Sequence, residues 1–243
     1  MFFWFKPRRR ILHALCANQG LVDTFPIAPA QLPRWWRELP GTALVQGVHG
    51  QPEATEILTA RSCPGIREFY QGAFSMPLWA DYEIAVDHRG EVSAHSTCKI
   101  SQHAEAQWGS WAQGWTNFKL ESPWTLVEDR ALMWTMEDDV YARDSLDDYR
   151  ILPGRVEYRY QHTSSILVMT PRARIPGSYL RFDLSAGSSM VLLRPCSGEH
   201  VEVRSEAVTP AELARYTKWK FARTGDYLKA AKIRQRACPF GSV

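Results

Sequence analysis

The sequence predicts a mainly β protein with short helices, built on an antiparallel β-sandwich core of the jelly-roll or β-clip type. Residues 76–101 alternate apolar and polar side chains with a period of two, which is typical of strands that bury one face. Pro-Gly pairs at 153–154 and 176–177, and an Ala-Gly pair at 186–187, divide the later chain into short segments. Such pairs mark turns between strands.

The first part of the chain, residues 1–52, is expected to form a proline-rich N-terminal arm packed on the core. Its residues 8–16 fit either a strand or a short helix. Four prolines interrupt any long helix: Pro26, Pro29, Pro33 and Pro40. Residues 33–39, PRWWREL, predict one short helix with proline in its first turn. Its Trp35 and Trp36 either pin the arm onto the core or contact a partner.

Residues 53–208 are expected to form the β-rich core domain. Within them, Pro64 and Gly65 interrupt the pattern, and the residues from Ile66 to near Gly72 predict a short helix. A hairpin follows, with a glycine-containing turn at 88–90 and a return strand over 92–100. Its first strand places Tyr82, Ile84 and Val86 on the buried face. Further strands are expected at 118–126, 132–136, 155–160, 178–184, 190–193 and 201–206.

The C-terminal residues 209–243 are expected to form a helical extension. Thr209, Pro210 and Glu212 form the pattern of a capping box, which starts a helix. Asp226 is the expected N-cap of a second helix.

Composition excludes several classes of protein. The chain has 243 residues, 45% of them hydrophobic, and a net charge of +3, which fits a folded protein and gives little support for nucleic-acid binding. Eight acidic residues over 128–148 and eight basic residues over 215–236 form two patches that either face solvent or contact partners. Five widely spaced cysteines without a CxxC motif indicate reduced thiols. No signal peptide and no apolar run of about 18 residues is found, so a soluble intracellular product is expected.

The stretch HSTCKISQH, residues 95–103, raises the question of a metal site. On one strand His95 and Cys98 face opposite ways, so they cannot share an ion, and Cys98 is expected to be a small buried hydrophobe. No metal or other cofactor is expected. The alternative is an iron site of the two-His-one-carboxylate kind, formed by His103 and Glu105 with His162 or His200. The acidic pairs at 138–139 and 147–148 are expected to be solvated, with ordinary pKa values.

Aromatic residues supply the remaining candidates. Trp108, Trp111 and Trp115 precede a predicted strand and fit either core packing or a ligand platform. Near the C-terminus, Trp219, Lys220 and Arg223 either dock a helix on the core or contact a partner, including a nucleic-acid backbone. The motifs GxGxxG, GxxxxGK, HExxH and GxSxG are absent.

Several segments together resemble an uncharacterised family found in tailed bacteriophages and in some, often marine, bacteria. The segments are FFWFKPRRR, FPIAPAQLPRWWRELP, CPGIREFYQGAFSMPLWADYEI, SPW, LPGRVEY and CPF. After SPW the family usually continues with a PPGY-type segment, whereas this chain has TLVEDRALMW. The strand pattern AGxxxVLLRP is similar in outline to the β folds of deoxyuridine triphosphatases. The family has no established activity, so the resemblance implies no catalytic residues.

Two main hypotheses for function follow. The first is a non-enzymatic phage structural or assembly protein that forms homo-oligomers and contacts other phage proteins, first in the host cytoplasm and then in the virion. The second is a metal-dependent enzyme or small-ligand-binding protein of the jelly-roll or cupin type. Its pocket is expected to be lined by Trp79, Tyr82, His95, His103 and His162.

Overall fold

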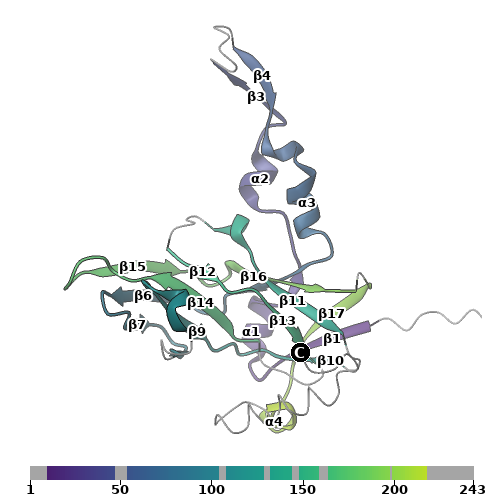
Figure 1. Cartoon of the computed structure of the whole chain (residues 1–243). Helices are drawn as coiled ribbons and strands as arrows, with labels where there is room; N and C mark the ends of the chain where they lie inside the picture. Colours follow the sequence, from purple (N-terminus) through teal and green to yellow (C-terminus); the bar gives the residue numbers. More distant parts are fainter. Residues whose placement is uncertain are drawn as a thin grey trace, which may run out of the picture.

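The structure, a computed structural model of the chain, describes residues 10–46, 54–103, 108–128, 132–143, 148–158, 164–197 and 199–217. These residues form a mainly β molecule, as predicted, with several antiparallel sheets in a sandwich-like core. One slender arm of helices and a hairpin leaves this core (Figure 1).

Four sheets make up the core. The first has the order β10 (Thr125–Glu128), β1 (Arg10–Cys16) and β17 (Val201–Ala207). The second has the order β13 (Gly154–Glu157), β11 (Met133–Asp138), β16 (Ser189–Pro195), β5 (Phe74–Pro77) and β2 (Ala28–Pro29). The third has the order β12 (Arg150–Ile151), β14 (Ile166–Pro171), β9 (Trp115–Leu120) and β8 (Ile100–Ser101). The fourth has the order β15 (Tyr179–Leu184), β6 (Tyr82–Asp87) and β7 (Val92–His95).

The N-terminal segment lies inside the core. Strand β1 pairs with β10 on one side and, in parallel, with β17 on the other, so the core is not purely antiparallel. Leu12, Ala14 and Cys16 are buried, which explains why this apolar segment is a central strand. Residues 10–29 therefore add β1 and β2 to core sheets, and the described segments that project are later ones, residues 33–46 and 54–71.

The predicted hairpin is confirmed in its first half. Strands β6 and β7 pair in antiparallel fashion around the turn at 88–90, and Tyr82, Ile84 and Val86 are buried. The return strand is shorter than predicted. It ends at His95, because Ser96 Oγ donates to the Asp81 carbonyl (2.6 Å) and accepts from the Cys98 amide (3.2 Å), which bends the chain. Strand β8 then joins β9 in another sheet.

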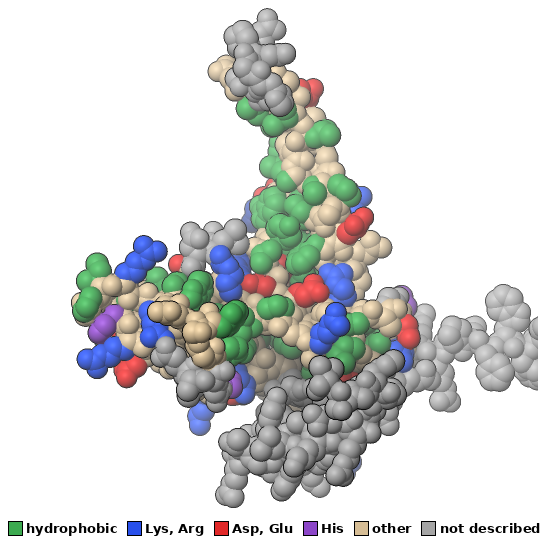
Figure 2. Space-filling model, viewed as in Figure 1, with side chains coloured by type: hydrophobic (Ala, Val, Ile, Leu, Met, Phe, Trp, Pro, Cys, Tyr) green, Lys and Arg blue, Asp and Glu red, His purple; other side chains and the backbone are tan. Residues whose placement is uncertain are grey.

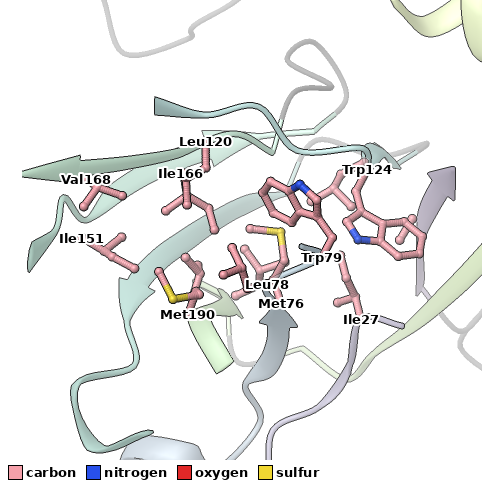
Figure 3. Close-up of a cluster of buried hydrophobic side chains, with 14 of the residues drawn as sticks. Ile27, Met76, Leu78, Trp79, Leu120, Trp124, Ile151, Ile166, Val168 and Met190 are labelled. Carbon is pink, nitrogen blue, oxygen red and sulfur yellow. The ribbon is translucent and has the colours of Figure 1, made fainter. Parts of the chain in front are cut away.

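The main core lies between facing sheets. Leu120, Ile166 and Val168 point from β9 and β14 toward side chains of β5, of β16 and of the residues that follow β5 (Figure 3). These partners are Met76, Leu78 and Met190. Trp124 and Trp134 are among the largest side chains with almost no exposure. Such aromatic burial removes much apolar surface from water and is a main stabilising contribution.

Short helices complete the fold. Helix α1 (Gln19–Thr24) is capped by Asn18, and α4 (Pro210–Thr217) begins with the predicted capping box. The Glu212 amide donates to Thr209 Oγ1 (3.2 Å), and the Thr209 amide donates to Glu212 Oε2 (2.9 Å). The expected second C-terminal helix lies outside the described residues. In the described part of the chain, no helix is long and apolar enough to cross a membrane.

Candidate functional site

The first candidate is the arm, residues 33–46 and 54–71, which projects from the β core (Figure 1). It contains α2 (Arg34–Glu38), the hairpin of β3 (Thr42–Val45) and β4 (Thr55–Leu58), the 3₁₀ turn η2 (Ala60–Ser62), and α3 (Pro64–Tyr70). The helices form where the sequence predicted them. Pro33 precedes α2 and Pro64 occupies the first turn of α3, where a missing amide hydrogen costs nothing.

A small apolar cluster at the base of the arm joins it to the core. Trp36, Ile66 and Tyr70 pack together with Ala73 and with Leu192 of β16. Trp36 is only 5% exposed, and its Nε1 donates to the Ala60 carbonyl (2.9 Å). This burial contradicts Trp36 as a partner-contact residue and agrees with the pinning role. Its neighbour Trp35 remains 43% exposed, although its Nε1 donates to the Tyr141 carbonyl (2.8 Å).

Beneath this cluster lies a buried carboxylate that sequence analysis placed in solvent. Asp139 is 2% exposed and accepts hydrogen bonds from Tyr70 Oη and Ser189 Oγ, each at 2.5 Å. Ser189 also shares a hydrogen bond with Ser75 (2.6 Å). Burial raises the pKa of Asp139 above its ordinary value, against the lowering effect of these donors. The expectation of an ordinary, solvated carboxylate is therefore wrong, because α3 covers the end of β11.

The neighbouring acidic residue is also fixed. Asp138 forms an ion pair with Arg143 and accepts from the Ile151 amide (3.0 Å). The Arg143 guanidinium in turn lies 4.2 Å from the centre of the Tyr149 ring. On the other side of the arm base, Arg194 donates to the carbonyls of Phe69 and Gln71 at the end of α3. A cation there also complements the negative end of the helix dipole. Of these contacts, the two hydrogen bonds of Arg194 join the end of α3 to β16.

Beyond this base, the hairpin is thin and apolar. Strands β3 and β4 form a two-stranded sheet that, within the described residues, pairs with no other strand. Leu44 and Leu58 are 75% and 73% exposed, and Val45 and Ile57 are also exposed. Figure 2 shows hydrophobic side chains along the arm up to the hairpin. An isolated two-stranded hairpin is marginally stable in water, and exposed apolar side chains in a group mark contact surfaces.

The second candidate is a cavity of about 130 Å³, here called the tryptophan cavity, at the β6–β7 turn and the start of β9. The 3₁₀ turn η4 (Gly109–Ala112) contributes Ala112 to its wall. The residues that line it are Arg89, Gly90, Glu91, Gln102, His103, Trp108, Ala112, Trp115, Thr116, Asn117 and Arg172. Trp111 adjoins it, with its ring centre 6.0 Å from that of Trp108, and is 69% exposed.

The predicted ligand pocket does not form as expected. Trp79 and Tyr82 are buried in the main core, and His95 lies on the exposed side of β7. Of the predicted lining residues, His103 reaches the tryptophan cavity, and His162 lies outside the described residues. The cavity was missed because its other walls come from the turn at 88–90 and from Arg172, far apart in sequence.

The alternative metal site stays a prediction. Glu105 and His162 lie outside the described residues, and His200 is exposed just before β17. Among the residues that the structure does describe, no group of three or more His, Cys, Asp and Glu could hold a metal ion. Four described cysteines, Cys16, Cys63, Cys98 and Cys196, are free thiols, and Cys98 is half-buried rather than fully buried.

A second buried carboxylate, Glu128, ends β10. Trp134 Nε1 donates to its Oε2 (3.0 Å), and burial raises the pKa of Glu128. Arg10, which lies nearby and partly offsets this shift, is paired with Glu199 (2.8 Å).

The remaining partner-contact candidates lie either at the tryptophan cavity or outside the described residues. Trp108 and Trp115 are half-buried, and Trp111 is exposed beside the cavity. Trp219, Lys220 and Arg223 lie outside the described residues. No protein-family model, curated protein or solved structure matches the chain.

Proposed function

We propose that this protein is a non-enzymatic structural or assembly component that works through protein–protein contacts, and that the hairpin of the arm is its main contact element. The observation that carries this proposal is the exposure of Leu44 and Leu58 on a hairpin that only its own two strands stabilise. A second copy of the chain is the first partner that we propose.

The physical argument concerns cost and gain. The base of the arm is joined to the core by a buried tryptophan, a buried carboxylate and Arg194. Burying an exposed leucine side chain contributes about 1.5–3 kcal/mol. Leu44 and Leu58 lie on one face of the hairpin, and Val45 and Ile57 lie on the other. A partner that covers the Leu44–Leu58 face therefore gains binding energy and stabilises a hairpin that is marginal alone.

The resemblance to proteins of tailed bacteriophages supports a more specific form of the proposal. In this form the chain has a jelly-roll or β-clip core, assembles in the host cytoplasm, and becomes part of the virion through contacts with itself and with other phage proteins. No metal, cofactor or membrane enters this proposal.

The test is the native mass of the purified chain, measured by light scattering over a range of concentrations. The wild-type mass should be a multiple of the 27.8 kDa chain mass. The double variant Leu44→Ser/Leu58→Ser should shift the mass toward that of one chain. A matched control is Ile175→Ser/Tyr179→Ser, which removes two exposed apolar side chains far from the arm and should leave the mass unchanged. Equal masses for all three proteins would contradict the hairpin as the self-contact element.

A second candidate function is the binding of a small ligand. The tryptophan cavity favours it, because an aromatic pair lies beside a cavity with polar lining residues. A metal-dependent enzyme of the cupin type would need a ligand set that includes Glu105 and His162. Metal analysis of the purified protein tests that version, and stoichiometric iron or zinc would favour it over the structural proposal.

A further inference from the structure

The tryptophan cavity has the features of a site for a polar, uncharged ligand, and this conclusion does not depend on the proposed contact function. It lies at the turn between β6 and β7, at the left of Figure 1 and away from the arm. An indole exposed to the extent of Trp111 leaves a large apolar face in water beside a hollow, which is costly unless something covers it.

The local backbone explains why Trp111 faces outward. Gly109 begins the tight turn η4 and Gly114 follows it, with φ values of +55° and +79°, which glycine adopts at no steric cost. The turn places Trp111 beside Trp108, with their ring planes inclined by 36°. These two aromatic side chains are here called the tryptophan platform.

The floor of the cavity is pre-organised by hydrogen bonds. Gln102 Nε2 donates to the Gly90 carbonyl (2.7 Å) and to Thr116 Oγ1 (2.9 Å). Asn117 accepts from the His103 amide (3.2 Å) and donates to its carbonyl (3.4 Å). A site whose walls are already fixed loses little entropy when a ligand binds.

Charged side chains of both signs line the cavity: Arg89, Arg172 and Glu91. The arginines carry donors and the Glu91 carboxylate is an acceptor, so a ligand with both kinds of group is accommodated. The Glu91 carboxylate would repel a phosphate that approaches the arginines, which favours a neutral ligand over a nucleotide.

We propose that the tryptophan cavity binds one ring of a neutral carbohydrate, and that Trp111 stacks against the next ring of the chain. A sugar ring has an apolar face of C–H groups, which are electropositive and pack on the electron-rich face of an indole. Its edge carries hydroxyls that both donate and accept, which suits the donors of Arg89 and the acceptor of Glu91 in the cavity lining.

The experiment follows the indole N–H signals of the full-length protein by NMR during titration with neutral tetrasaccharides of glucose, galactose, mannose and N-acetylglucosamine. At least one should produce saturable shifts, and Trp108→Phe should remove one of the shifted signals. Trp111→Ala should weaken the binding of that tetrasaccharide about tenfold, equivalent to about 1.4 kcal/mol. Glu91→Gln and Arg89→Gln should each weaken its binding severalfold. Trp35→Ala, which removes another exposed indole, should leave the affinity unchanged.

Two results would overturn the proposal. One is the absence of saturable shifts with every tetrasaccharide, while circular dichroism shows that the protein is folded. The other is tighter binding of a thymidine tetranucleotide, lost in Trp111→Ala, which would assign the platform to nucleic acid. Neither result would affect the native-mass test of the hairpin, so the two proposals fail separately.

Discussion

At the scale of single residues, Asp139 shows how position changes chemistry. Its side chain is buried and receives two hydroxyl donors, and burial raises its pKa. The folded protein therefore binds this proton more tightly than the unfolded chain does. As a result, the contribution of Asp139 to the free energy of unfolding is greatest at low pH. It declines as pH rises from the unfolded carboxyl pKa of about 4 through the raised folded value.

Replacing Asp139 with asparagine should remove this pH dependence, since the amide is neutral at every pH. The free energy of unfolding of Asp139→Asn minus that of the wild type should increase as pH rises from about 4 toward neutrality. Urea unfolding at a series of pH values measures this difference. Asp183→Asn, at an exposed position, is the control and should show no such trend. A difference for Asp139→Asn that stays constant with pH would show that the carboxylate is not shifted in the fold.

At the scale of elements, the arm depends on a cluster much smaller than the main core. Five buried residues hold α2 and α3 to β16, with Trp36 the largest of them. The hairpin beyond has exposed apolar side chains and adds little stability of its own. Loss of one side chain at the base should therefore release the arm while the core sheets stay folded.

Trp36→Ala tests this dependence. Removing a buried tryptophan costs about 3–5 kcal/mol in a well-packed core. Amide hydrogen exchange should show lost protection in α3 and retained protection in β9 and β14. The adjacent Trp35→Ala, which removes a partly exposed indole, should change protection far less. Equal effects of the two substitutions would mean that the small cluster does not anchor the arm.

At the scale of the whole molecule, the two ends of the described chain meet. Strand β1 near the N-terminus lies between β10 and β17, and Leu12 and Ala14 are fully buried there. Helix α4 follows β17 and has mostly exposed side chains. The N-terminal strand is thus essential to the core, whereas α4 lies at its periphery.

Truncation at each end should have opposite results. A chain that begins at residue 17 should fail to fold, because it leaves β10 and β17 without their shared partner and exposes their buried faces. A chain that ends at residue 208 should keep a cooperative unfolding transition in urea, followed by tryptophan fluorescence. Cooperative unfolding of the first truncation would show that β1 is dispensable.

Much of the local structure could be predicted from the sequence. The period-two alternation gave strand β6 and its buried face, Pro33 and Pro40 bounded α2, and the capping box located α4. Each of these signals acts between residues close in sequence, through backbone geometry, local hydrogen bonds or the spacing of side chains on one face.

Only the tertiary structure decided the rest, because those features join residues that are far apart in the chain. Asp139 is buried by α3, about seventy positions earlier in the sequence, so no local pattern marks its raised pKa. The parallel pairing of β1 with β17, the separation of the hairpin from the core, and the meeting of Arg172 with the turn at Gly90 have the same origin. The sequence by itself determined a mainly β chain with short helices, and long-range packing decided which of its tryptophans and carboxylates remain at the surface.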